Sequence, residues 1–72
     1  MPTWRELKRF CDRDGWELYK NTDHYFYRKD DESGTPRHTK VSRGSGEIHG
    51  NLWNEILKKQ LKVTLEYFNS KK

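Results

Sequence analysis

The sequence predicts an α+β domain in which a helix, three antiparallel strands and a second helix follow one another, with a short extra helix at the C-terminal end. Apolar residues recur at helical spacing near both ends of the chain, and between them lies a stretch where apolar and polar residues alternate as in strands. Strands that follow in series through short turns pair antiparallel. We therefore expect two layers, with the helices packed on one face of a three-stranded sheet.

The first helix is expected to begin at Trp4. Thr3 and Glu6 have the spacing of a capping box, in which each side chain accepts a hydrogen bond from the backbone N–H of the other. Gly15 can adopt the left-handed conformation that ends many helices. The apolar stripe of this helix consists of Trp4, Leu7, Phe10 and Cys11. We expect core packing for Cys11 rather than reactivity.

The strands are expected at residues 16–20, 24–29 and 37–42. The alternation in the first strand predicts that it is half-buried. Turn-forming residues separate it from the second strand, and residues 30–36 are too polar for anything but a loop. Residues 43–46 then end the sheet.

Helical spacing returns from about Gly50 and predicts the second helix. Its apolar face is expected to hold Leu52, Trp53, Ile56, Leu57 and Leu61. Thr64 can cap a last short helix that holds Leu65 and Phe68. We expect residues 69–72 to fray.

Length and composition restrict the kind of site. A chain of 72 residues forms one domain, residues 1–72, that buries only about 60% of its unfolded surface, so a site must be shallow. Basic residues exceed acidic ones, 15 to 11, which favours nucleic acid or an acidic protein as partner. The one cysteine excludes an internal disulfide, and no apolar run is long enough for a membrane helix or a signal peptide. We expect a soluble cytoplasmic protein.

The candidate site lies in the second strand, at Asp-His-Tyr-Phe-Tyr-Arg, residues 23–28. Alternation prevents all its aromatic side chains from pointing the same way. If Phe26 points inward, Tyr25 and Tyr27 are exposed; if it points outward, His24 shares its face. In either case an aromatic surface is left on which bases or a partner protein could stack.

His24 is the candidate catalytic residue. RNA can be cleaved without a metal or cofactor when its 2′-hydroxyl attacks the neighbouring phosphate, which requires a base, an acid and positive charge around the phosphorane. An imidazole can act as acid or base near neutral pH. The cations that the strands could bring close to the phosphate are Lys20, Arg28, Lys40 and Arg43. We expect His38 and His49 to be bystanders, although either could assist.

We expect no metal and no cofactor. The cysteine and the three histidines lack the paired spacing of a structural zinc site. The segment Gly44-Ser45-Gly46 before a helix could cradle a phosphate with backbone N–H groups, but a plain flexible loop is the interpretation we favour. The length and the lack of a parallel sheet exclude a dinucleotide-binding fold.

Across nearly its full length the chain resembles the HicA family, the mRNA-cleaving toxins of bacterial toxin-antitoxin systems. The matching positions are Gly15-Trp16, the strand His24-Tyr25-Phe26-Tyr27, Val41, Gly46-Glu47-Ile48, Ile56-Leu57-Lys58, Leu61, Thr64 and Phe68. Three positions depart from the family pattern. Thr22-Asp23 replaces small residues before the histidine, Ser42-Arg43-Gly44 replaces Pro-x-His, and Asn51-Leu52 replaces Gly-Thr.

The resemblance implies a fold like that of a double-stranded-RNA-binding domain and a metal-independent endoribonuclease, an mRNA interferase. It also implies that His24 is catalytic and that a HicB-type antitoxin inhibits the protein. The free protein is expected to be a monomer and the inhibited form a hetero-oligomer. The substrate-binding residues we expect are Lys20, Tyr25, Arg28, Lys40 and Arg43.

Two other functions remain open. A non-catalytic RNA-binding module of the same fold would bind RNA with a steep salt dependence and would not cleave it. A protein-interaction domain would use its exposed aromatic side chains to dock a partner and would not bind RNA.

Overall fold

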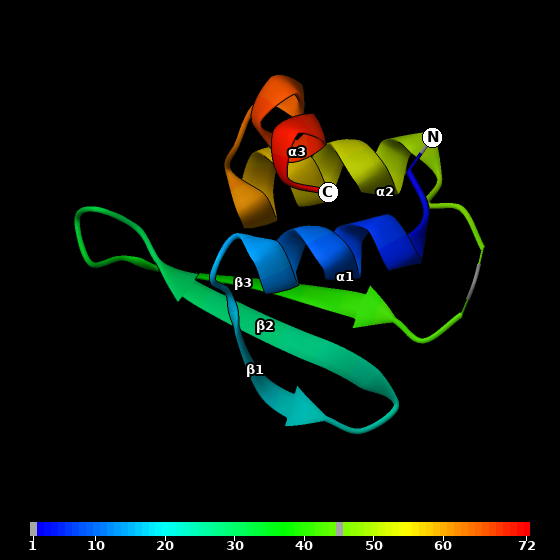
Figure 1. Ribbon diagram of the computed structural model, residues 1–72, viewed down its shortest axis with the longest axis horizontal. Helices are drawn as coiled ribbons and strands as arrows, with labels where there is room; N and C mark the ends of the chain where they lie inside the picture. The colour runs from blue at the N-terminus through cyan, green and yellow to red at the C-terminus, as the bar shows by residue number, and fades with distance from the viewer. Residues whose placement is uncertain (1, 45) are drawn as a thin grey trace.

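The computed structural model of the chain describes residues 2–44 and 46–72. The elements in chain order are α1 (Trp4–Arg13), β1 (Glu17–Asn21), β2 (His24–Asp30), β3 (Pro36–Ser42), α2 (Gly50–Glu55), the π-helical segment η1 (Ile56–Leu61) and α3 (Leu65–Lys71). The strands form one antiparallel sheet in the order β1-β2-β3. The predicted α+β class is confirmed. Figure 1 shows the helices together on one side of the sheet.

The capping box predicted at the start of α1 is confirmed. The Glu6 N–H donates to Thr3 Oγ1 at 3.2 Å, and the Thr3 N–H donates to Glu6 Oε1 at 3.0 Å. Gly15 has a φ of +81°, the left-handed conformation expected after the end of this helix. Local sequence signals therefore set both ends of α1.

The core lies between the sheet and the helices. Leu7, Phe10 and Cys11 of α1 are fully buried, as predicted, and burial raises the pKa of the Cys11 thiol. The ring of Phe68, from α3, lies 4.9 Å from that of Phe10 and 4.7 Å from that of Trp53, between centroids. This aromatic cluster joins α1, α2 and α3.

Two expectations about burial are wrong. Every residue of β1 is exposed, including Leu18 at 41%, because β1 is an edge strand and the helices lie over β2 and β3 (Figure 1). Leu52, expected on the apolar face of the second helix, is also exposed, at 39%, and so is Leu65 of α3, at 51%. Both lie in the first turns of their helices, where the short helices do not reach the core.

The C-terminal end of the chain is helical rather than frayed, so that expectation is wrong too. Thr64 caps α3 as predicted, accepting from the Tyr67 N–H at 3.1 Å. Lys72 then forms an ion pair with Glu6 at 2.8 Å, and the Lys72 carbonyl accepts from Arg13 at 2.8 Å. Contacts with α1, at the opposite end of the sequence, hold the last turn in place.

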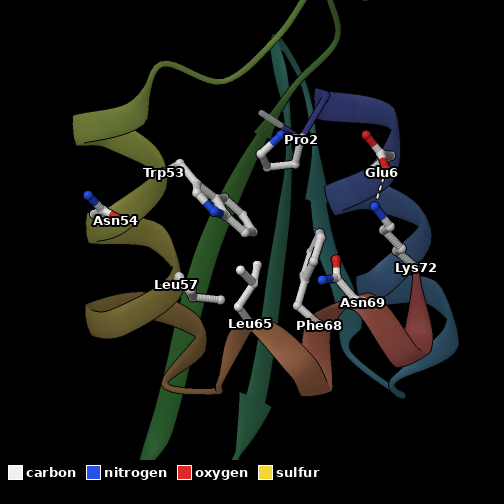
Figure 2. A pocket seen from close by; sticks show the side chains of 9 residues that line it. All are labelled: Pro2, Glu6, Trp53, Asn54, Leu57, Leu65, Phe68, Asn69 and Lys72. Atoms are coloured by element: carbon white, nitrogen blue, oxygen red, sulfur yellow. Dashed lines mark ion pairs between the residues drawn. The ribbon is translucent and has the colours of Figure 1, made fainter.

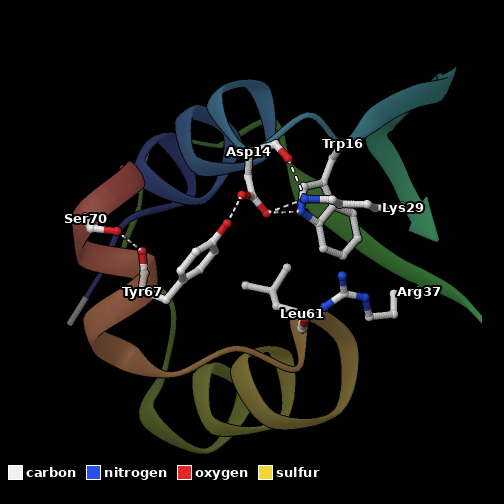
Figure 3. A network of polar contacts seen from close by, with 7 residues as sticks. All are labelled: Asp14, Trp16, Lys29, Arg37, Leu61, Tyr67 and Ser70. Carbon is white, nitrogen blue, oxygen red and sulfur yellow. Dashed lines mark hydrogen bonds and ion pairs between the residues drawn. The ribbon is translucent and has the colours of Figure 1, made fainter. Parts of the chain in front are cut away.

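A buried carboxylate ties α1, β2 and α3 together (Figure 3). Asp14, whose side chain is 5% exposed, accepts hydrogen bonds from Trp16 Nε1 at 3.1 Å, from Lys29 Nζ at 3.1 Å and from the Tyr67 hydroxyl. Burial acts to raise the pKa of Asp14, but the hydrogen bonds from these three partners outweigh it, and the pKa lies below its ordinary value. The ionised form of Asp14 is therefore stabilised by the fold.

Within the described residues, the helices are all too short or too polar to cross a membrane.

Candidate functional site

The face of the sheet turned away from the helices, here called the outer face, carries His24. Along β2 the side chains of Tyr25 and Tyr27 point toward the helices, and those of His24, Phe26 and Arg28 point away. Tyr27 is buried, and its hydroxyl donates to Asp12 Oδ1 at 2.7 Å. Of the two orientations that alternation allowed, the structure has the one in which Phe26 points outward and His24 shares its face.

A β-bulge in β1 adds an aromatic ring to the outer face. Leu18 pairs with Tyr27 and Lys20 pairs with Phe26, so one extra residue, Tyr19, lies between two successive pairs. The Tyr19 ring lies 6.2 Å from that of Phe26 and 5.9 Å from that of His38, between centroids. Tyr19 and Lys20 thus both reach the outer face, which strict alternation would not allow.

Phe26 is the centre of the outer face. Its neighbours across the sheet are Lys20 on β1 and Lys40 on β3. The ring centroid of Phe26 lies 5.3 Å from Lys20 Nζ and 6.4 Å from the ring centroid of His24. Among the described residues, no carboxylate forms an ion pair with Lys20 or Lys40. An imidazole and two lysines whose charges are not neutralised therefore surround an aromatic ring.

Arg28 lies on the outer face but its charge is paired. Its Nε donates to Glu17 Oε1 at 2.8 Å, and its guanidinium carbon lies 5.5 Å from the centroid of the Tyr19 ring. The hydrogen bond that Arg28 donates to Glu17 raises the pKa of Arg28. Because Glu17 competes for this guanidinium, Lys20 and Lys40 are better placed than Arg28 to attract a phosphate.

The His24 ring is half-buried, and one hydrogen bond sets its tautomer. Nδ1 lies 2.8 Å from the backbone carbonyl oxygen of Asp23. A carbonyl oxygen can only accept, so Nδ1 carries the proton in the neutral ring and Nε2 keeps its lone pair. That is the form needed to accept a proton from a substrate hydroxyl.

The remaining two predicted site residues lie elsewhere. Tyr25 points to the helix side of the sheet, where it packs against the core. Arg43 follows β3 and lies over the Tyr25 ring, with its guanidinium carbon 4.5 Å from the ring centroid. The structure thus brings together His24, Lys20, Arg28 and Lys40 on the outer face, and separates them from Tyr25 and Arg43.

The other two histidines differ in their positions. His38 pairs with Arg28 across the sheet and lies on the outer face beside Tyr19. His49 is exposed and immediately precedes α2. Only His38 shares a face with His24.

In the loop before α2, the structure describes Gly44 and Gly46 of the possible phosphate cradle. Ser45 lies outside the described residues, and the Gly44 N–H donates to Ser42 Oγ at 3.2 Å. At least one of the backbone N–H groups is therefore already used. Among the described residues, no group of three or more His, Cys, Asp or Glu side chains is placed to hold a metal ion.

The cavity between the helices is not part of this site. The cavity has a volume of about 440 Å³. Figure 2 shows Trp53, Leu57, Leu65 and Phe68 around it, with the ion pair of Glu6 and Lys72 on one side. The lining is mostly apolar, and His24 does not contribute to it.

Phe26 and Tyr19 are not among the site residues that the sequence predicts. Alternation alone leaves the orientation of Phe26 open. Tyr19 and Lys20 share the outer face only because of the bulge, which no residue in β1 indicates. No family model, curated protein or solved structure matches this chain. The resemblance to HicA therefore stays a prediction.

Proposed function

We propose that the protein is an endoribonuclease of the HicA type, an mRNA interferase that cleaves RNA with His24 and without a metal ion. The fold is then of the double-stranded-RNA-binding-domain type. The protein acts in the cytoplasm, as a monomer when free and in a hetero-oligomer with a HicB-type antitoxin when inhibited. The observation that carries the proposal is the set of groups around Phe26, namely one imidazole with a free Nε2 and two unpaired lysines on an exposed aromatic face.

In the proposed reaction His24 Nε2 accepts the proton of a ribose 2′-hydroxyl. The 2′-oxygen forms a bond to the adjacent phosphorus, and the bond from phosphorus to the 5′-oxygen breaks. The products are a 2′,3′-cyclic phosphate and a 5′-hydroxyl, and the leaving oxygen receives a proton from the imidazolium or from water. General acid–base help of this kind contributes a factor of roughly 10² to 10⁴ in rate.

The neighbouring residues have distinct roles in this proposal. Lys20 and Lys40 attract the substrate phosphate and stabilise the charge that develops on its oxygens. Phe26 and Tyr19 offer flat surfaces on which bases can stack, as in proteins that bind single-stranded RNA. Each role uses a side chain that is already on the outer face.

Growth and cleavage assays test the proposal. Overexpression of the wild type should arrest bacterial growth, and the purified protein should cleave RNA in the presence of a metal chelator. His24→Ala should lose both activities. His38→Ala is the matched control, because it removes an imidazole from the same face and should leave cleavage largely unchanged. Equal activity of the wild type and His24→Ala would exclude His24 from the mechanism.

A second candidate function is a non-catalytic RNA-binding module. The exposed ring of Tyr19 and the half-buried ring of Phe26 favour it, because base stacking on them does not require His24. This function predicts RNA binding without cleavage, equally in the wild type and in His24→Ala.

A further inference from the structure

A second site with concentrated positive charge lies at the end of the sheet, on the helix side of β2. It is a hollow of about 260 Å³ between the first turns of α1 and the segment after β3. Arg5, Lys8 and Arg43 all line it, and the described residues that line it include no carboxylate. We call this hollow the strand-end pocket.

Arg43 is held firmly in the strand-end pocket without losing its charge. Its Nε donates to the Thr22 carbonyl oxygen at 2.8 Å, its Nη2 donates to Asn21 Oδ1, and its Nη1 donates to the Tyr25 hydroxyl at 3.3 Å. All three acceptors are neutral. A guanidinium has five N–H donors, so two remain for a ligand. Such a pre-oriented fork suits the oxygens of a phosphate.

Lys8 is a second cation in the pocket that can contact an anion. Lys8 Nζ lies 5.1 Å from the centroid of the Tyr25 ring, on which Arg43 also lies, so two cations share one aromatic ring. Lys8 also forms an ion pair with Asp12 at 3.0 Å, so a phosphate that binds Lys8 has to displace this exposed carboxylate.

The strand-end pocket is adjacent to the outer face at one point. Ser42, which lines the pocket, is the cross-strand partner of His24. Arg43 also holds the turn that precedes His24 through its bond to Thr22. A strand of RNA with one phosphate at His24 therefore passes the end of the sheet within reach of this pocket.

We propose that the strand-end pocket binds a backbone phosphate of the RNA, next to the one cleaved at His24, through Arg43 and Lys8. The inference rests on the proposed function and deepens it, because it assigns the pocket to the same substrate. An RNA phosphate fits better than a carboxylate side chain, because the pocket offers several donors that converge on a small volume next to the proposed cleavage site.

The test is the salt dependence of RNA binding, measured with a 2′-O-methyl oligonucleotide, which keeps every phosphate but cannot supply the nucleophile. Each phosphate contact with single-stranded nucleic acid contributes about −0.7 to the slope of log K against log salt concentration. Arg43→Gln and Lys8→Gln should each make the slope less steep by about that amount. Lys58→Gln removes the same charge from the exposed surface of η1 and should leave the slope unchanged.

A second measurement locates the phosphate. Methylphosphonate linkages, which are uncharged, are placed one at a time along the oligonucleotide. One position should weaken binding to the wild type several-fold and have no effect on Arg43→Gln. That linkage should neighbour the one that is cleaved in the unmodified RNA. Arg43→Gln could also alter the turn that Arg43 supports. Lys8→Gln does not affect this turn, so the same measurement on Lys8→Gln tests the pocket independently.

The outcomes separate the two proposals. If RNA is cleaved and both variants keep the wild-type slope, the pocket proposal is overturned while the ribonuclease stands. If the wild type does not cleave RNA but both variants lose slope, the pocket binds phosphate in a non-catalytic module and the cleavage proposal fails. A third outcome is that both variants keep the wild-type salt slope for RNA but bind an oligoglutamate peptide more weakly than the wild type does. That result would assign the pocket to an acidic protein segment and overturn the RNA assignment.

Discussion

Nδ1 of His24 lies 2.8 Å from the carbonyl oxygen of Asp23, and this contact determines which substitutions separate binding from catalysis. His24→Asn keeps an N–H donor near the position of Nδ1 but has no group at Nε2. We expect it to slow cleavage by a factor of roughly 10² to 10⁴ while binding of uncleavable RNA stays within a few-fold of wild type. Single-turnover cleavage rates measure the effect. A cleavage rate close to that of the wild type would contradict the assignment of Nε2 as the base.

Phe26 is expected to matter for RNA and little for folding. It lies on the outer face, so Phe26→Leu keeps an apolar side chain but removes the flat ring. RNA binding should weaken by about 1–3 kcal/mol, the range for loss of one stacked base, while the thermal midpoint changes little. Phe68→Ala gives the opposite result: a loss of about 3–5 kcal/mol in the free energy of unfolding, because that ring is fully buried. Fluorescence anisotropy and denaturant unfolding measure the two quantities.

Asp14 should make stability depend on pH. Its folded pKa is lowered, so its contribution is complete above the unfolded pKa of about 4 and is lost as pH falls through the folded pKa. At neutral pH, Asp14→Asn should lower the free energy of unfolding by about 1–3 kcal/mol. The difference from wild type should shrink as the pH falls below about 4. Urea unfolding at several pH values measures it.

The control for Asp14 is Glu32→Gln, in the exposed loop between β2 and β3, which should leave the stability curve unchanged. A constant difference between Asp14→Asn and wild type at all pH values would show that the hydrogen bonds to Asp14 do not depend on its charge.

Lys62 ends η1 in a left-handed conformation, with a φ of 57°. That conformation costs a residue with a Cβ about 1–2 kcal/mol, and glycine adopts it readily. Lys62→Gly should therefore raise the free energy of unfolding by about 0.5–1 kcal/mol, despite the greater freedom of glycine in the unfolded chain. Lys59→Gly, within η1, should lower it by about 1 kcal/mol. Thermal or urea unfolding of both variants measures the two effects. A lower free energy of unfolding in Lys62→Gly as well as in Lys59→Gly would contradict the prediction.

The parts of the fold that the sequence predicted correctly depend on contacts between near neighbours. The capping box of Thr3 and Glu6 spans one turn, and Gly15 supplies its own left-handed backbone. The burial of Phe10 and Cys11 follows from helical spacing alone. Such features need no information about the rest of the chain.

The parts that were missed depend on contacts between distant residues. The orientation of Phe26 is decided by Tyr27, which fills the core and bonds to Asp12 in another element. The last turn of α3 is ordered by Glu6, which is more than sixty residues away in the sequence. For the candidate site, residue types alone predicted His24, Lys20 and Lys40. Arg43 is separated from them because the pleat of β3 and the hydrogen bond from Arg43 to Thr22 place it on the other side of the sheet.

The exposed edge of β1 has a consequence for the behaviour of the protein at high concentration. An uncovered strand beside solvent-facing aromatic rings is a template for unwanted pairing with another molecule. Lys20 lies at this edge and Lys40 across the same face, and two copies brought together there would repel each other. The lysines that would attract a polyanion thus also oppose self-association. Replacing them with neutral residues would lower the solubility of the protein more than its free energy of unfolding.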